Sequence, residues 1–172
     1  MNSEPDAVLG PFSSPDARAT PWASALAVIG EAEVFWLSTV RPDGRPHVTP
    51  LPAAWSLGGM FFTTGGQERK ARNLEHESRC VLTTGTNALT GVDIVIEGVA
   101  AVVDGRSDSE RAVADFQLKY GAHLTAPEGS WHGPGEAVVA GDTRLYRVAP
   151  TVGLAFGKLP ASSQTRHTWP SR

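Results

Sequence analysis

The sequence predicts a mainly β fold of short antiparallel strands, a barrel or a sandwich, with a few short helices around it. Aromatic and β-branched segments alternate with turn signals about every 8–12 residues, which is typical of both architectures. Prolines within one such segment indicate an edge strand, and Gly98 inside the longest segment indicates the kind of bend that closes a barrel. A Rossmann domain is not expected, because no GxGxxG motif joins a strand to a helix.

Length and composition are those of one folded domain. The chain has 172 residues, of which 41% are hydrophobic, and is long enough to bury a substantial core. Charged residues make up only 19% and the net charge is −3, so the chain lacks the basic surface through which proteins grip nucleic acid or anionic membranes. We therefore expect phosphate binding only at a local site, and neither nucleic acid nor membrane as a partner.

The chain has the features expected of a soluble cytoplasmic protein. Its single cysteine, Cys80, excludes an intramolecular disulfide and lies in an apolar run, where we expect a small buried hydrophobe. Residues 1–19 lack the basic and apolar regions of a signal peptide and are expected to form a flexible lead-in to a single domain at 20–172. No apolar segment approaches the ~20 residues that a membrane-spanning helix needs.

The domain begins with a helix and a hairpin. A threonine cap followed by proline precedes a helix predicted at 21–32. Strands predicted at 34–40 and 45–55 flank the turn Pro42-Asp43-Gly44 and form a hairpin. A further strand at 60–64 is expected to complete a three-stranded meander.

The second strand of this hairpin is interrupted by Pro46, Pro50 and Pro52. Because proline has no N–H to donate to a neighbouring strand, this strand should lie at an edge of the sheet or border a gap. A ligand could occupy such a gap.

The second half of the domain alternates strands and helices. A surface helix at 107–120 should end at Gly121, because glycine is favoured just after the end of a helix. The other expected elements are a short helix at 69–77, strands at 80–84, 92–103 and 143–156, a long loop at 122–142 and a basic, aromatic tail at 157–172.

The most informative stretch ends one strand and begins one helix. Thr63 and Thr64 are followed by a Gly-Gly break and a predicted helix that starts with Arg69, Lys70 and Arg72. Hydroxyls, amide N–H groups and positive charge at one helix N-terminus are what phosphate binding needs. A cationic run alone is more often a solvated face. Cations at a helix N-terminus are unfavourable without an anion, so the position of this run favours a phosphate-binding site, here called the phosphate grip, formed by the end of the strand and the start of the helix. Thr63 and Thr64 point to opposite faces of the strand, so at most one of their hydroxyls should reach the ligand.

Other catalytic constellations are missing from the sequence. The five histidines show no metal-ligand spacing and there is no CxxC or GxSxG motif, so we expect no metal site and name no catalytic residue. Trp36 is expected in the core. Trp131 in the loop and Trp169 in the tail have no local core to enter, and are expected to cover a cofactor ring or to pack into a partner subunit.

Three segments carry a family resemblance. They are Leu37-Ser38-Thr39-Val40-Arg41-Pro42-Asp43-Gly44-Arg45-Pro46-His47-Val48-Thr49-Pro50, Phe61-Phe62-Thr63-Thr64 and Arg69-Lys70-Ala71-Arg72-Asn73-Leu74. In this order they resemble the pyridoxamine 5'-phosphate oxidase-like flavin-binding split-barrel superfamily, and within it the flavin/deazaflavin oxidoreductase branch. The resemblance implies a six-stranded antiparallel split β-barrel with flanking short helices, a homodimer, and cofactor sites in the grooves between subunits.

The resemblance also implies which residues bind the cofactor. The segment 47–50 would run beside the flavin ring and its ribityl chain, and Arg69 and Lys70 would bind the phosphate. From one subunit the implied residues are His47, Val48, Thr49, Pro50, Thr63, Thr64, Arg69, Lys70 and Asn73, and from its partner Trp131, Lys158, Arg166 and Trp169.

The implied function is an oxidoreductase that transfers hydride between FMN or coenzyme F-420 and a small conjugated substrate. The two cofactors share the phosphate grip, and no residue in the sequence decides between them. The C-terminal segment lacks the arginine-rich substrate signature of true pyridoxamine phosphate oxidases. A non-catalytic flavin- or haem-binding or sensing protein on the same barrel is the alternative, because no acid or base can be named. A structural barrel with a solvated basic helix is a third.

Overall fold

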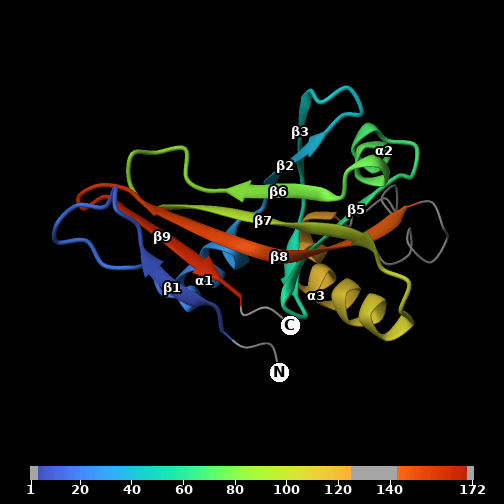
Figure 1. Ribbon diagram of the computed structural model, residues 1–172. Coiled ribbons are helices and arrows are strands. Elements are labelled where there is room, and N and C mark those ends of the chain that lie inside the picture. The colour runs from blue at the N-terminus through green and yellow to red at the C-terminus, as the bar shows by residue number, and fades with distance from the viewer. Residues whose placement is uncertain (1–3, 125–142, 170–172) are drawn as a thin grey trace.

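The computed structural model describes residues 4–124 and 143–169, and its main feature is a single antiparallel sheet. Nine strands form this sheet within the described residues, with the order β1-β9-β8-β7-β6-β2-β3 along its main path. They are β1 (Asp6–Leu9), β2 (Phe35–Val40), β3 (Pro46–Leu51), β4 (Ala54–Ser56), β5 (Gly59–Thr64), β6 (Arg79–Thr84), β7 (Val92–Val102), β8 (Arg144–Gly157) and β9 (Ser163–Thr168). Figure 1 shows β7 and β8 crossing the middle of the molecule, with the β2–β3 hairpin rising from it.

The predicted fold class is confirmed, and all six predicted strands are present as β2, β3, β5, β6, β7 and β8. The predicted strand 45–55 is divided into β3, which pairs with β2, and β4, which pairs with β5, so the successive pairing of the meander is present. β5 also pairs with β8 and does not pair with β3. β3 instead ends the main path of the sheet, as predicted for a proline-rich strand. Pro46 and Pro50 cannot donate hydrogen bonds, so they favour an edge over a place between two strands.

Described residues near both ends of the chain belong to the sheet, which corrects the expectation of a flexible lead-in. The flexible lead-in contains β1, and the tail contains β9. β9 pairs with β8 from Val152↔Thr168 to Gly157↔Ser163, and β1 pairs with the other side of β9. β7 pairs with one edge of β8, and β9 pairs with the end of its other edge. This pairing satisfies backbone N–H and C=O groups of β8 that would otherwise lie at an open edge.

Three helices flank the sheet in the described residues, namely α1 (Trp22–Glu31), α2 (Arg69–His76) and α3 (Arg106–Leu124). The first two confirm their predictions. The third runs past Gly121, so the expected helix end there is wrong and the expected loop starts inside the helix. Phe116 and Tyr120 pack against Ala54 of β4, which holds this last part of α3 on the barrel. The rest of the predicted loop, 125–142, lies outside the described residues.

The core lies between the sheet and its helices. Its largest fully buried side chains include Phe35, Leu37, Phe62, Leu82, Ile96 and Val148. The predicted irregularity at Gly98 is confirmed by a register shift between Glu97 and Gly98, where a Cβ atom would lie 2.4 Å from the carbonyl oxygen of Ala149. Cys80 is buried as predicted, and burial raises the pKa of its thiol to about 12.

Trp36 is 51% exposed, so its predicted place in the core is wrong. Successive residues of a strand face opposite sides, and on β2 the buried side belongs to Phe35 and Leu37. Trp36 therefore lies on the outer face of the sheet.

Candidate functional site

The basic helix α2 presents different residues to the core and to solvent. Lys70 is 8% exposed and Asn73 is fully buried, whereas Arg69 and Arg72 are exposed. Arg72 donates a hydrogen bond from Nη2 to Gln67 Oε1 at 2.9 Å. A buried ammonium is costly unless it has anionic or polar partners. Lys70 is therefore the cation of this helix that the fold holds in place.

Glu68, directly before α2, accepts three hydrogen bonds. Its Oε1 accepts from Thr64 Oγ1 at 3.0 Å and from the Gly65 amide at 2.9 Å, and its Oε2 is in an ion pair with Lys70 Nζ. Burial alone would raise the pKa of this carboxyl, but the bonds from Lys70, Gly65 and Thr64 leave it lowered. A hydroxyl, an amide and an ammonium thus converge on one anion.

Asn73 connects α2 to the hairpin. Its Nδ2 donates to Thr39 Oγ1 at 2.9 Å, and that hydroxyl lies 3.5 Å from His47 Nδ1. Asn73 Oδ1 is buried and has no hydrogen-bond partner among the described residues. A buried amide oxygen without a partner is unusual, and it marks this position as one where a ligand could donate a hydrogen bond.

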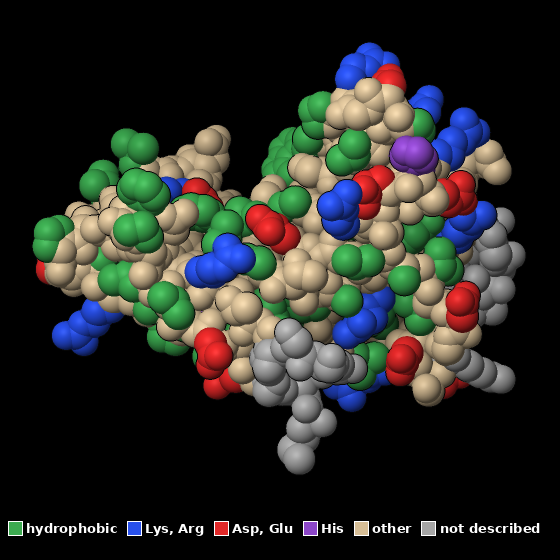
Figure 2. All heavy atoms as spheres, in the orientation of Figure 1, with side chains coloured by type: hydrophobic (Ala, Val, Ile, Leu, Met, Phe, Trp, Pro, Cys, Tyr) green, Lys and Arg blue, Asp and Glu red, His purple; other side chains and the backbone are tan. Residues whose placement is uncertain are grey.

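His47 lies within the field of three cations. Its pKa is lowered by burial and then by the charges of Arg41, Lys70 and Arg69. Figure 2 shows Lys and Arg side chains gathered at the end of the molecule where Figure 1 places the β2–β3 hairpin and α2. The charges of Arg41, Lys70 and Arg69 would stabilise an anion beside His47.

The structure divides the predicted residues of β3 between two faces. His47 and Thr49 are half-buried and share the face of Thr39 and Leu37, whereas Val48 and Pro50 are exposed on the outer face. Of these four residues, His47 is the one that the charges of Arg69 and Lys70 on α2 affect. The four predicted residues 47–50 therefore do not all meet at one site in a single subunit.

The two threonines of β5 are also separated. Thr64 contacts Glu68 beside Lys70. Thr63 lies on the other face of the strand, the face of Phe61, which packs against Ala112 of α3. This agrees with the expectation that at most one of the two hydroxyls reaches the grip.

The outer face of the sheet contains a cavity of about 440 Å³. Its walls come from β2, β3, β6 and β7 and include Ser38, Thr39, Val40, Pro46, Val81 and Val99. Trp36 and Val48, exposed by 51% and 54%, lie on the same face. The cavity is also lined by the charged residues Glu77, Arg79 and Glu97, so apolar and charged side chains surround it. Thr39 contributes both to this cavity and to the Asn73 contact.

Two of the four residues expected from a partner subunit, Lys158 and Trp169, make contacts within their own subunit. Lys158 Nζ donates to Asp93 Oδ1 and to the carbonyl of Thr86, both at 2.8 Å. The ring of Trp169 lies 5.1 Å from Trp22 and 6.2 Å from Trp55, so the expectation that it has no local core is wrong. β9 brings this ring back to the barrel. Arg166 is exposed, and Trp131 lies outside the described residues.

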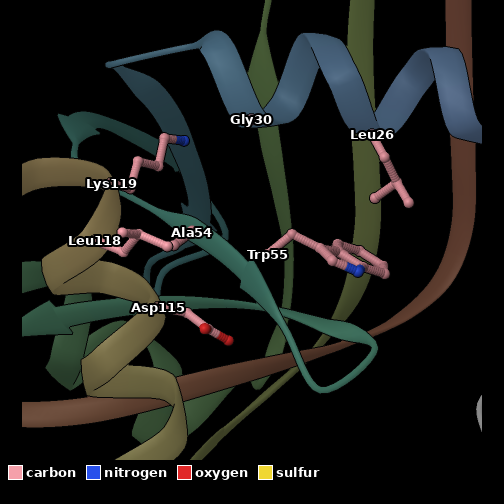
Figure 3. Close-up of a pocket in the computed structure, with 7 residues that line it drawn as sticks. All are labelled: Leu26, Gly30, Ala54, Trp55, Asp115, Leu118 and Lys119. Atoms are coloured by element: carbon pink, nitrogen blue, oxygen red, sulfur yellow. The ribbon is translucent and has the colours of Figure 1, made fainter.

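A second cavity, of about 430 Å³, lies between α1, β4 and α3 (Figure 3). Lys119 on its wall donates to the carbonyl oxygens of Ile29 at 2.8 Å and Ala53 at 3.0 Å. Burial lowers the pKa of this amine to about 8. Because both bonds join α3 to backbone carbonyls of neighbouring segments, Lys119 has a structural role, which the sequence analysis missed.

The sequence analysis also missed two residues at the grip. Glu68 was overlooked because three cationic residues follow it closely in the sequence. An acidic residue just before a helix is nevertheless a recognisable sign of interaction with the helix N-terminus. Arg144 of β8 packs over Gly66, where a Cβ atom would lie 3.0 Å from its guanidinium, and donates to Glu75 at 2.6 Å. Arg144 lies beside Gly66 because β8 pairs with β5, which is far away in sequence. No local sequence pattern predicts this pairing.

Metal and membrane features are missing from the part of the chain that the structure describes. No group of three or more His, Cys, Asp or Glu side chains could hold a metal ion there. Nor is any helix in those residues both long and apolar enough to cross a membrane.

The sequence comparison then identifies the family. The family model for pyridoxamine 5'-phosphate oxidase matches residues 22–154, which include the hairpin, the grip and β7. The chain belongs to the pyridoxamine 5'-phosphate oxidase family. No curated protein matches the sequence.

Solved structures show the same fold at low sequence identity. The conserved hypothetical protein Rv2991 from Mycobacterium tuberculosis is 20% identical, with a TM-score of 0.67 over 84% of this chain and 88% of that one. HutZ, a haem storage protein from Vibrio cholerae, is 21% identical, with a TM-score of 0.58 over 79% and 93%. An F420 reductase is 22% identical, with a TM-score of 0.54 over 74% and 93%. Members of this fold thus include a reductase and a haem protein.

Proposed function

We propose that this protein is a cytoplasmic oxidoreductase that binds FMN or coenzyme F-420 through the phosphate and transfers hydride to or from a small conjugated substrate. The observation that carries the proposal is the convergence of Thr64, Gly65 and Lys70 on one carboxylate. Donors that hold a carboxylate also suit a phosphate oxygen, since both are anionic acceptors. The family match and the F420 reductase of the same fold support the cofactor class.

The residues present fit a phosphate-bearing cofactor. Lys70 and Arg69 would bind the phosphate, and Thr64 and the Gly65 amide would donate to it. Asn73, with its unpartnered Oδ1, and His47 extend the site towards the hairpin. These side chains come from β5, α2 and β3, which the Asn73–Thr39 bond and the sheet hold in place.

When bound, such a cofactor supplies the hydride chemistry. The protein would then bind the cofactor, orient it towards the substrate and exclude water from the site. The cations around His47 would hold the phosphate end of the cofactor. We assign no catalytic acid or base to any residue.

We propose a homodimer in which the outer face of the sheet meets a second copy of the chain. Strand register places Arg166, Leu154, Val95, Thr83, Trp36 and Pro50 in one row across six strands, none of them buried. Four of the six are apolar, and apolar side chains that are left partly exposed on one face are typical of an interface. The partner would close the cavity and bring its own Arg166 to this face, which is the part of the expected second-subunit contribution that we retain.

A non-catalytic flavin- or haem-binding protein is the second candidate. Haem proteins of the same fold favour it, as does the lack of an assignable acid or base. The two candidates differ in what the loaded protein does. A ligand that binds stoichiometrically but gives no turnover would support storage or sensing.

The experiment combines cofactor loading with turnover. Purified protein is titrated with FMN, F-420 and haem by absorbance, and each loaded form is assayed in its reduced state against a panel of quinones and enones. We expect a flavin-type spectrum and turnover with at least one acceptor. A Soret band with haem, together with no binding of either flavin-type cofactor, would reject the oxidoreductase.

A further inference from the structure

We propose that Glu68 sets the charge that the phosphate grip accepts, so that the site selects a singly charged phosphodiester over a doubly charged phosphomonoester. The inference rests on the proposed function, because it concerns the same grip. It goes further by naming the chemical class of the ligand and the residue that selects it.

The first step is the position of the Glu68 carboxylate. Its partners are the Thr64 hydroxyl, the Gly65 amide and the Lys70 ammonium, which are three of the four donors assigned to the phosphate. The side chain of Glu68 is 52% exposed, whereas that of Lys70 is 9% exposed. The carboxylate therefore reaches into the grip from solvent and neutralises its buried cation.

The second step is what a ligand meets there. A phosphate that enters the grip shares these donors with Glu68 or displaces the carboxylate from them. In both cases a negative charge remains close to the phosphate, because the backbone of Glu68 is fixed at the start of α2 by the hydrogen bond from the Arg72 amide to the Glu68 carbonyl oxygen. Glu68 also keeps its charge at neutral pH, since its pKa lies below the ordinary value.

The third step is the charge of the ligand. A phosphomonoester carries close to two negative charges at pH 7 and above, because its second pKa is about 6, whereas a phosphodiester carries one. Coulomb repulsion from Glu68 scales with that charge. Arg69 still attracts both ligands, but the cost of Glu68 is about twice as large for the monoester. FMN is a monoester and F-420 a diester, so the inference favours the second cofactor type.

The test uses three flavins that share one ring system. Riboflavin has no phosphate, FMN is a monoester, and the methyl ester of FMN is a diester with one charge less. Dissociation constants are measured by flavin fluorescence at pH 8 for the wild type, Glu68→Gln and Glu31→Gln. Glutamine keeps the shape and the acceptor for Thr64 and Gly65, and Glu31→Gln removes the same charge at the end of α1. A thermal melt of each variant confirms that it folds.

We expect Glu68→Gln to tighten FMN about tenfold and the methyl ester only about threefold, with riboflavin unchanged, because the removed repulsion scales with ligand charge. At pH 5, where FMN loses most of its second charge, the two gains should become equal. Equal gains at pH 8, no gain, or the same effect from Glu31→Gln would overturn the role of Glu68 while leaving phosphate binding intact. If the wild type and Glu68→Gln bind neither these three flavins nor coenzyme F-420, the proposed function itself fails.

Discussion

Asn73 and Thr39 form a buried hydrogen bond of 2.9 Å that joins α2 to β2. Thr39 pairs across the hairpin with His47, so the bond also fixes the grip relative to β3. Through this contact, one helix and two strands that are separate in sequence make one site.

Removing the buried cation should weaken cofactor binding. We expect Lys70→Ala to reduce the binding free energy of the preferred phosphate-bearing cofactor by about 1.5–3 kcal/mol, because a charged hydrogen bond is lost. Arg72→Ala is the matched control, since Arg72 lies on the same helix but is exposed and bonded to Gln67. The dissociation constants are measured by absorbance titration. Equal losses in the two variants would show that the helix acts only through its total charge.

His47 should report the arrival of an anion. Burial and the charges of Arg41, Lys70 and Arg69 hold its pKa below the ordinary value, and a bound phosphate opposes those charges. We expect its pKa to rise by about one unit on binding, measured by NMR titration of the imidazole protons. The pKa of His167, which is lowered by burial alone, should not move. If the cofactor bound and the pKa of His47 did not change, the phosphate would not lie near His47.

Trp36 should hold the two subunits together. Changing this half-exposed ring to glutamate places a charge in the proposed interface, and loss of a central tryptophan weakens an interface by about 2 kcal/mol or more. We expect Trp36→Glu to be a monomer by sedimentation at concentrations where the wild type is a dimer. Leu118→Glu, at a site 88% exposed on α3, should remain a dimer. If Trp36→Glu remained a dimer, the interface would have to lie on another face of the protein.

His167 should make the protein less stable in acid. Its ring is fully buried, 5.1 Å from Trp22, and neither ring nitrogen has a hydrogen-bond partner among the described residues. Burial lowers its pKa from the usual 6.5, so the unfolded chain binds more protons once the pH falls below 6.5. The free energy of unfolding should therefore fall with pH in that window, by up to about 1.4 kcal/mol per pH unit from this group.

Urea denaturation between pH 5 and 7 checks this slope. His167→Phe keeps an aromatic ring against Trp22 and cannot titrate, so its slope should be shallower than that of the wild type. Identical slopes in the two proteins would mean that His167 does not contribute to acid sensitivity.

The strands that the sequence predicted are those with apolar side chains on at least one face. β9 escaped prediction because its buried residues, Thr165 and His167, are polar. Its place depends on pairing with β8, which no local pattern contains. Trp36 was misplaced for a related reason: both faces of β2 carry apolar residues, and alternation alone does not say which face is inside.

The candidate site was predicted in part for similar reasons. Lys70 and Thr64 could be found because a strand end, a glycine break and a helix start are local signals. The position of Glu68 between them is a matter of side-chain geometry, and Arg144 and Thr39 reach the site through pairing and packing between distant segments. The local motif therefore predicts only part of the candidate site, and contacts between distant segments supply the rest.

The most direct test of the account is whether binding depends on the phosphate. Wild-type protein is titrated in parallel with FMN, coenzyme F-420 and riboflavin at low salt, and the three dissociation constants are compared. We expect micromolar binding of FMN or F-420, at least about tenfold tighter than riboflavin, because Lys70 and its neighbours would hold the phosphate. Riboflavin binding as tightly as both phosphorylated cofactors, or no binding of any of the three, would contradict it.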